Sequence, residues 1–104
     1  MAMEVIPIQQ ITITGNDGEA RELSFSSAEL FIVTDHGSRQ WYIDTNEAGP
    51  AQLLDLYYTS DNIQVRLSAA AADGRHFEGT AYFHSNVPKQ ACVLRGDDEL
   101  QESK

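Results

Sequence analysis

Apolar and polar residues alternate with a period of two along most of this chain, a pattern typical of half-buried β-strands. Turn signals interrupt the alternation at regular intervals, in GNDG at 15–18, DHG at 35–37, DG at 73–74 and SNVP at 85–88. Short strands separated in this way are typical of hairpins in a sandwich or barrel. The pattern therefore predicts an all-β fold, a small antiparallel barrel or sandwich of six to seven strands built from hairpins.

The clearest predicted hairpin spans residues 63–83. Residues that face each other across two antiparallel strands lie on the same side of the sheet. A three-residue loop from Ala72 to Gly74 satisfies this rule, because it pairs Ile63 with Phe83, Val65 with Ala81, Leu67 with Gly79 and Ala69 with Phe77. Such a loop needs a left-handed residue in its last position, and Gly74 supplies it.

The same reasoning predicts two earlier hairpins and a final strand at 91–95. A three-residue loop at 35–37 pairs Phe31 with Trp41 and Leu30 with Tyr42. A five-residue loop from Asn16 to Ala20 places Ile11 opposite Phe25 and Ile13 opposite Leu23. The apolar residues of the first strand change from even to odd positions between Ile8 and Ile11, which predicts a β-bulge near Gln9 and Gln10.

One segment departs from the alternation. In GPAQLLDLYYTSDN, apolar residues at 53, 54, 57 and 58 repeat at helical spacing, and Pro50 suits a first helical turn. We expect one short helix near residues 50–58. Its apolar residues are expected to plug a barrel end or cover an edge strand, with an exposed partner-binding knob as the alternative.

Length and composition set the domain organisation. A chain of 104 residues with 41% hydrophobic residues predicts a single β domain over 1–104. The two ends, about 1–3 and 97–104, carry few apolar residues and are expected to fray.

The net charge of −9 arises from 16 acidic residues against seven scattered Lys and Arg residues. Nucleic acids and anionic membranes need a clustered basic surface, so neither is an expected partner. The acidity serves solubility, or meets a basic partner. The lone Cys92 excludes an internal disulfide and is expected to pack as a small hydrophobe. With no apolar run of 18 residues and no secretory leader pattern, we expect a cytoplasmic protein.

Candidate chemistry is confined to DGRHFEGTAYFHSN at 73–86. On one extended strand, His76 and His84 stand about 26 Å apart, too far to share a metal ion. His76 and Glu78 are the remaining weak metal candidates, and they need a third ligand from elsewhere. No motif for a nucleophile, a phosphate loop or a metalloprotease is present. We expect no catalytic residue and no cofactor, and an enzyme is disfavoured.

The aromatic residues give the stronger signal. Candidate partner-binding residues are Trp41, Tyr42, Tyr57, Tyr58 and Tyr82. The segment from Leu30 to Val33 is apolar on both faces, which predicts a strand covered on both sides. The second cover is either a further layer of the same core or a second copy of the chain, since Tyr and Trp are enriched in interfaces.

These features lead to three functional hypotheses. The first is a non-enzymatic binding or assembly module whose partner is an unknown protein or a second copy, giving a homodimer. The alternative is an acidic inhibitor or immunity-type protein for a basic partner. The second alternative is a small metal-dependent enzyme that uses His76 and Glu78.

Overall fold

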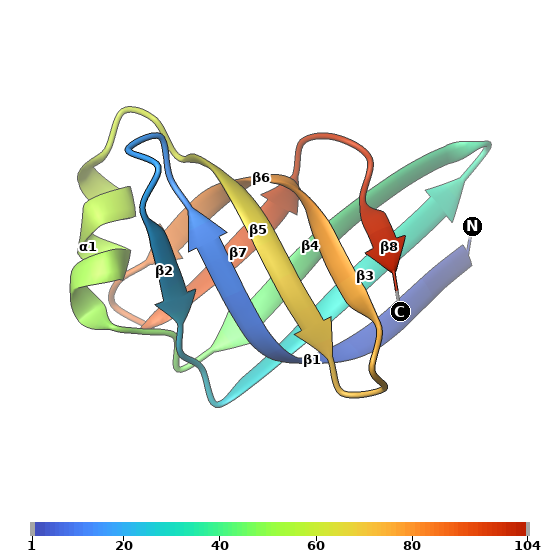
Figure 1. Cartoon of the computed structure of the whole chain (residues 1–104), viewed down its shortest axis with the longest axis horizontal. Helices are drawn as coiled ribbons and strands as arrows, with labels where there is room; N and C mark the ends of the chain where they lie inside the picture. The colour runs from blue at the N-terminus through green and yellow to red at the C-terminus, as the bar shows by residue number, and fades with distance from the viewer. Residues whose placement is uncertain (1, 104) are drawn as a thin grey trace.

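The computed structural model describes residues 2–103, which form eight β-strands and one α-helix. In chain order these are β1 (Ala2–Thr14), β2 (Ala20–Leu23), β3 (Ser27–Asp35), β4 (Ser38–Asn46), α1 (Ala51–Thr59), β5 (Gln64–Ala71), β6 (His76–Asn86), β7 (Ala91–Gly96) and β8 (Gln101–Ser103). Six strands close an antiparallel barrel in the order β1–β3–β4–β7–β6–β5, because β5 pairs with β1 (Figure 1). The structure thus confirms the predicted all-β fold with one short helix, and the barrel replaces the sandwich alternative.

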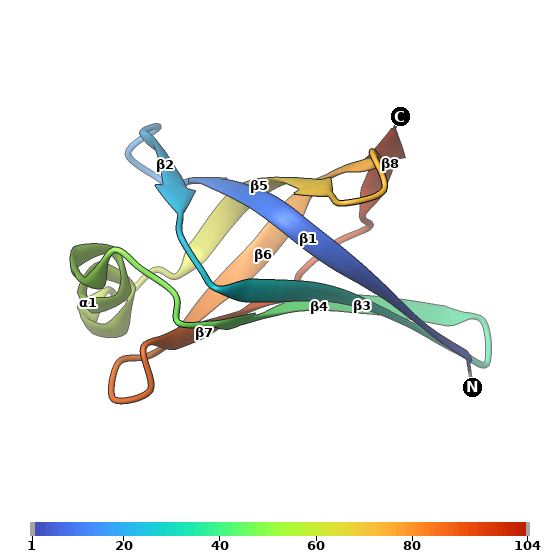
Figure 2. The ribbon, with the colours of Figure 1, turned by 90° about the horizontal axis from the view of Figure 1, so that it is seen from below.

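The closure depends on β1, which pairs with two other strands of the ring, β3 and β5, as well as with β2. Residues 2–8 pair with β3, and residues from Ile8 onward pair with β5 on the other edge. The register shifts between Ile8 and Gln10, which confirms the bulge predicted there. A bulge bends a strand and increases its twist, and Figure 2 shows β1 crossing from one wall of the barrel to the other.

The barrel interior is filled by alternate residues of every strand in the ring. The fully buried large side chains include Ile6, Ile11, Ile13, Leu30, Ile43, Val65, Phe77, Phe83 and Leu94. Interdigitated apolar side chains of this kind provide the main stabilising free energy of a small domain.

The β5–β6 hairpin has the register expected from its two apolar faces. Val65 pairs with Ala81, Leu67 with Gly79 and Ala69 with Phe77. Phe83 donates its backbone N–H to the carbonyl of Ile63 at 2.8 Å, which completes the predicted set. Gly74 adopts the left-handed conformation at φ 95°, as the three-residue loop requires.

The loop of the β3–β4 hairpin is one residue shorter than predicted, which shifts the register by one residue. Its loop has two residues, His36 and Gly37, because Asp35 pairs with Ser38. Both loop residues have positive φ, at 50° and 80°, as in a type I′ turn, which matches the twist of two strands. Phe31 therefore faces Tyr42, and the predicted pairing with Trp41 is wrong.

In the first hairpin the register is shifted by two residues from the predicted one. Ile11 faces Leu23 and Ile13 faces Arg21, so the five-residue loop runs from Gly15 to Glu19. β2 ends at Leu23 because Ser24 pairs instead with Gly49, the residue that leads into the helix. A shift of two residues leaves each side chain on its predicted face.

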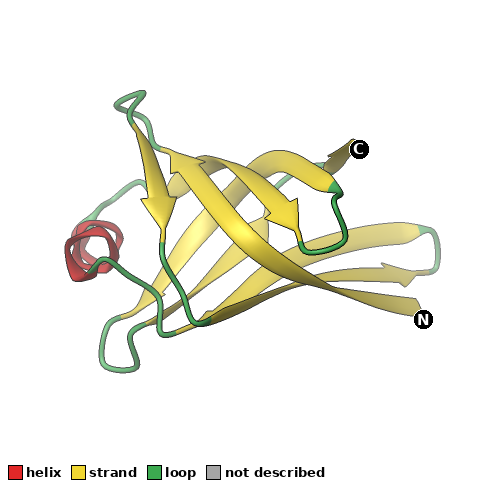
Figure 3. Ribbon diagram, turned by 60° about the horizontal axis from the view of Figure 1, so that its bottom comes forward, coloured by secondary structure: helices red, strands yellow, loops and turns green. Residues whose placement is uncertain are grey.

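The helix α1 lies at one end of the barrel (Figure 3), where it packs against β6. Tyr57 stacks on Phe83 with ring centroids 4.6 Å apart, and Leu53 and Leu54 are buried. The Ser85 hydroxyl donates a hydrogen bond to the carbonyl of Leu54. The helix therefore fills the core as predicted, except that Tyr58 is 67% exposed.

Trp41 fills the core at the β8 side of the barrel, away from α1. Its indole is 4% exposed and lies over Gly79 and Gly96. A Cβ atom built on Gly96 would lie 2.7 Å from Cδ2 of the indole, so these glycines make room for the ring. The indole Nε1 donates to the carbonyl of Asp98 at 2.7 Å, which ties β4 to the segment between β7 and β8.

The sequence predicts frayed segments at 1–3 and 97–104, but residues 2–3 lie in β1 and residues 101–103 form β8, while residues 97–100 connect β7 to β8. β1 begins at Ala2, opposite Thr34, and β8 pairs with β6. Arg75 joins both ends, since its guanidinium lies 3.3 Å from Glu4 and 3.7 Å from Glu102.

We expect Gly96→Ala to destabilise the protein by about 1–3 kcal/mol, because the added methyl group displaces a buried indole. Urea unfolding followed by circular dichroism measures the change. In the Trp41→Phe background the smaller ring leaves space, so Gly96→Ala should lower the unfolding free energy by less. An equal cost in both backgrounds would show that the indole is not the obstacle.

Candidate functional site

An apolar patch covers the outside of the barrel wall formed by β1, β3 and β4. Leu30 and Ile32 point into the core, so Phe31 and Val33 point outward by strand alternation. Register places Val5 and Tyr42 on either side of Phe31. We call this patch the outer apolar face; it consists of Met3, Val5, Phe31, Val33 and Tyr42.

The centre of the outer apolar face is a pair of stacked aromatic rings. The centroids of Phe31 and Tyr42 lie 4.8 Å apart with an interplanar angle of 12°. Beside them, Val5 is 42% exposed and Met3 is 57% exposed. Large apolar side chains exposed together on a sheet face commonly mark a surface that another protein covers.

The same row continues onto the next two strands. Arg95 faces Tyr42 on one side and Tyr82 on the other. Glu29 and Asp44 form the pair two residues away from the Phe31–Tyr42 pair along β3 and β4. The outer apolar face is therefore bordered by a guanidinium on one side and by two carboxylates at one end.

The five predicted partner-binding aromatics fall into two groups. Trp41 and Tyr57 are core residues and present no surface to a partner. Tyr42 belongs to the outer apolar face, Tyr58 lies exposed on α1, and Tyr82 is half-buried on β6. Trp41 and Tyr42 are consecutive residues of one strand and point to opposite faces, so they do not form a joint patch.

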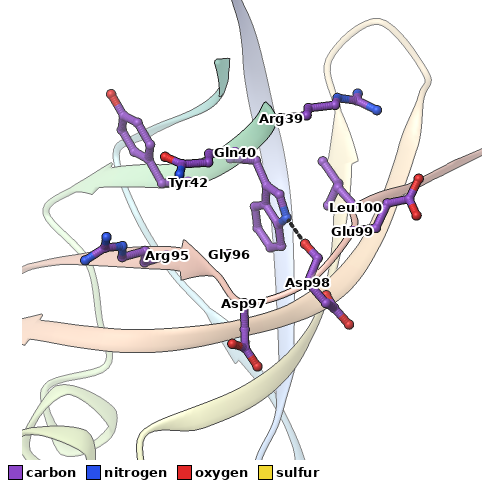
Figure 4. A pocket seen from close by; sticks show the side chains of 10 residues that line it. Arg39, Gln40, Tyr42, Arg95, Gly96, Asp97, Asp98, Glu99 and Leu100 are labelled. Carbon is purple, nitrogen blue, oxygen red and sulfur yellow. Dashed lines mark hydrogen bonds between the residues drawn. The ribbon is translucent and has the colours of Figure 1, made fainter. Parts of the chain in front are cut away.

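A cavity of about 510 Å³ opens beside Trp41, between the start of β4 and the segment after β7 (Figure 4). Its charged lining residues are Arg39, Arg95, Asp97, Asp98 and Glu99. Figure 4 shows the two guanidinium groups on opposite sides of the hydrogen-bonded indole. They do not converge on a common point, so the cavity has mixed charge without an assembled anion site.

Asp97 lines this cavity and is held in place by hydrogen bonds to two neighbouring strands. Its backbone N–H donates to the carbonyl of Thr80, and its carboxylate accepts a hydrogen bond from Gln64 at 2.9 Å. The same carboxylate raises the pKa of Tyr82 above its usual value, first because a hydrogen bond with it favours the protonated phenol, and second because its negative charge disfavours the phenolate. These contacts make Asp97 a structural residue, and Gly96 before it ends β7, one residue beyond the strand predicted at 91–95.

The weak metal candidates His76 and Glu78 lie together on β6. Nε2 of His76 is 2.8 Å from the Ser68 hydroxyl and 3.8 Å from the Glu78 carboxylate. The residues opposite them on β5 are Ala70 and Ser68, which follows from the register predicted for this hairpin. Within residues 2–103 no group of three His, Cys, Asp or Glu side chains is close enough to hold a metal ion.

Cys92 is buried inside the barrel and hydrogen-bonded to Thr45. The Thr45 hydroxyl donates to the Cys92 carbonyl at 2.9 Å and accepts from the Cys92 N–H at 3.1 Å. Burial raises the pKa of the thiol to about 11, although the contact with Thr45 lowers it slightly. A buried, protonated thiol is a poor nucleophile, so Cys92 has the packing role expected from the sequence.

Several of the carboxylates lie on or next to separate turns. Asp17 and Glu19 occupy the loop after β1, Asp35 ends β3, and Asp97 to Glu99 follow β7. Figure 1 shows the loop after β1 near α1 and the β3–β4 turn at the far end of the molecule. These turns lie apart, so their carboxylates do not join into the one large acidic face that the inhibitor hypothesis requires.

Comparisons with known proteins supply no relative for this chain. No protein-family model, curated protein or solved structure matches it. Among residues 2–103, no helix has the length and apolar character required to cross a lipid bilayer.

Met3 and Val5 are surface residues that the sequence analysis missed. They occupy odd positions of β1, whereas the buried Ile6 and Ile8 occupy even positions. Apolar residues on both faces of one strand are a usable signal for a second covered face.

The pH dependence of stability tests the burial of Cys92. Because its pKa is about 11 when folded and near 9 in an unfolded chain, folding favours the protonated thiol. That contribution is complete below pH 9 and is lost as the pH rises from about 9 to about 11. We expect Cys92→Ala to lose less unfolding free energy over this range than the wild type, as measured by urea unfolding. Val93→Ala, which keeps the thiol, should behave like the wild type; equal losses in all three proteins would contradict the assignment.

Proposed function

We propose that this protein is a non-enzymatic assembly module that self-associates through its outer apolar face. The single observation that carries the proposal is the row of Val5, Phe31 and Tyr42 on the outside of three adjacent strands. Aromatic rings at the centre of an apolar patch, with charges at its border, are the usual composition of a protein interface.

A second copy suits this face because the border charges are of both signs. In a two-fold interface the same surface is used twice, so each residue needs a complement on the same patch. Arg95 lies on one side of the row, and Glu29 and Asp44 lie at another border. In such a two-fold dimer, Arg95 of each copy faces Glu29 and Asp44 of the other. This arrangement also covers the stacked rings of Phe31 and Tyr42 in both copies.

Long-range electrostatics oppose this association. Each copy carries a formal net charge of −9, so two copies repel each other, and salt screens the repulsion. Self-association should therefore strengthen with ionic strength. An acidic inhibitor that binds a basic partner would show the opposite dependence, since salt screens attraction in that case.

We expect sedimentation velocity to show a monomer–dimer equilibrium that shifts toward dimer when NaCl rises from about 0.05 M to about 0.5 M. The double variant Val5→Thr with Phe31→Thr keeps strand-forming residues but removes apolar area from both copies. Its dimerisation should weaken by about 100-fold, which corresponds to about 3 kcal/mol.

The matched control is Leu56→Gln, which removes an exposed apolar side chain from α1, outside the outer apolar face. It should dimerise like the wild type. A wild type that stays monomeric at high salt and about millimolar concentration, or a control that weakens the dimer equally, would refute the proposal.

A further inference from the structure

The outer edge of β2 has an open position for another strand. Ser24 and Gly49 exchange two backbone hydrogen bonds of 2.8 and 2.9 Å on this edge. Backbone groups of a strand alternate between its two edges, so the N–H and C=O of Glu22 point the same way as those of Ser24. Among the described residues, β2 pairs only with β1, which lies on its opposite edge.

An apolar groove lies beside this edge and is lined by residues of β2 and α1. Its volume is about 460 Å³, and its lining residues are Arg21, Glu22, Pro50, Gln52, Leu53 and Leu56. Leu56 is 45% exposed at the groove although it belongs to the helix that fills the barrel end. The groove therefore offers an apolar contact within reach of unpaired backbone groups.

The charges around the groove favour a basic occupant. The Arg21 guanidinium is held by Asp17 at 2.9 Å and by Glu19 at 3.0 Å. Glu22 adds a third carboxylate on the groove itself, so carboxylates outnumber the single cation. Lys or Arg side chains on an approaching chain are attracted by this excess.

We propose that an extended segment of a basic partner protein binds here by adding a strand to the edge of β2. Its backbone pairs with Glu22, continuing the pairing that Gly49 makes with Ser24. One large apolar side chain enters the groove against Pro50, Leu53 and Leu56, and flanking Lys or Arg residues meet Glu19 and Glu22. Strand addition of this kind takes affinity from backbone hydrogen bonds and specificity from side-chain pockets. The site is separate from the outer apolar face and does not depend on self-association.

The test uses a panel of fluorescent peptides, acetyl-Lys-Thr-Val-X-Val-Thr-Lys-amide with Leu, Phe or Val as the central residue X. Fluorescence anisotropy should detect binding of at least one peptide, and binding should weaken as salt is raised. Amide chemical shifts in the full chain should change at Ala20, Glu22 and Leu56. Replacing both Lys residues of the peptide by Glu should abolish binding.

Leu56→Gln should lower the affinity for the peptide by about tenfold, because it removes the exposed leucine that lines the groove. Tyr58→Gln is the matched control, since Tyr58 is also exposed on α1 but does not line the groove; it should bind like the wild type. The double variant Val5→Thr with Phe31→Thr should also bind normally, which separates this site from the outer apolar face.

Three results would overturn the proposal. The first is no binding of any peptide at about millimolar concentration. The second is equal weakening by Leu56→Gln and Tyr58→Gln. The third is a set of chemical-shift changes centred on Phe31 and Tyr42 instead of Glu22.

Discussion

The pairing of β1 with two other strands of the ring, β3 and β5, is the constraint on which this barrel depends. β1 contributes residues 2–8 to β3 and its remaining residues to β5, and the shift between Ile8 and Gln10 lets one strand serve both walls. Without that change of register the sheet has two open edges, and open edges invite uncontrolled pairing with other chains. The bulge also explains why the buried isoleucines of β1 change from even to odd positions.

The sequence predicts registers well where only one face of a strand is apolar. In the β5–β6 hairpin, Gly74 and the alternating core residues agree on a single loop length. In β3, Phe31 and Ile32 are both apolar, so a slip of one residue still matches apolar with apolar and the pattern does not select a register. The register is set by the two-residue turn, in which His36 adopts a left-handed conformation. A histidine rarely adopts this conformation, so the sequence does not predict it.

The candidate sites were predictable in part for the same reason. The doubly apolar segment around Phe31 indicates a covered outer face, but only the register brings Val5 and Tyr42 to it. The groove beside β2 joins residues about 30 positions apart, Glu22 and Leu53, through contacts that no local pattern encodes. The burial of Trp41 likewise follows from Gly79 and Gly96, whose missing side chains leave space that only the folded barrel reveals.

The position of Trp41 has a consequence for how this protein is observed in solution. It is the only tryptophan in the chain, and its indole bonds to the backbone of the segment between β7 and β8. The intrinsic fluorescence is therefore a local report from one end of the barrel. Separation of that segment would bring water to the indole and move its emission to longer wavelength while the remaining strands stay paired, so this signal and the far-ultraviolet dichroism need not change together.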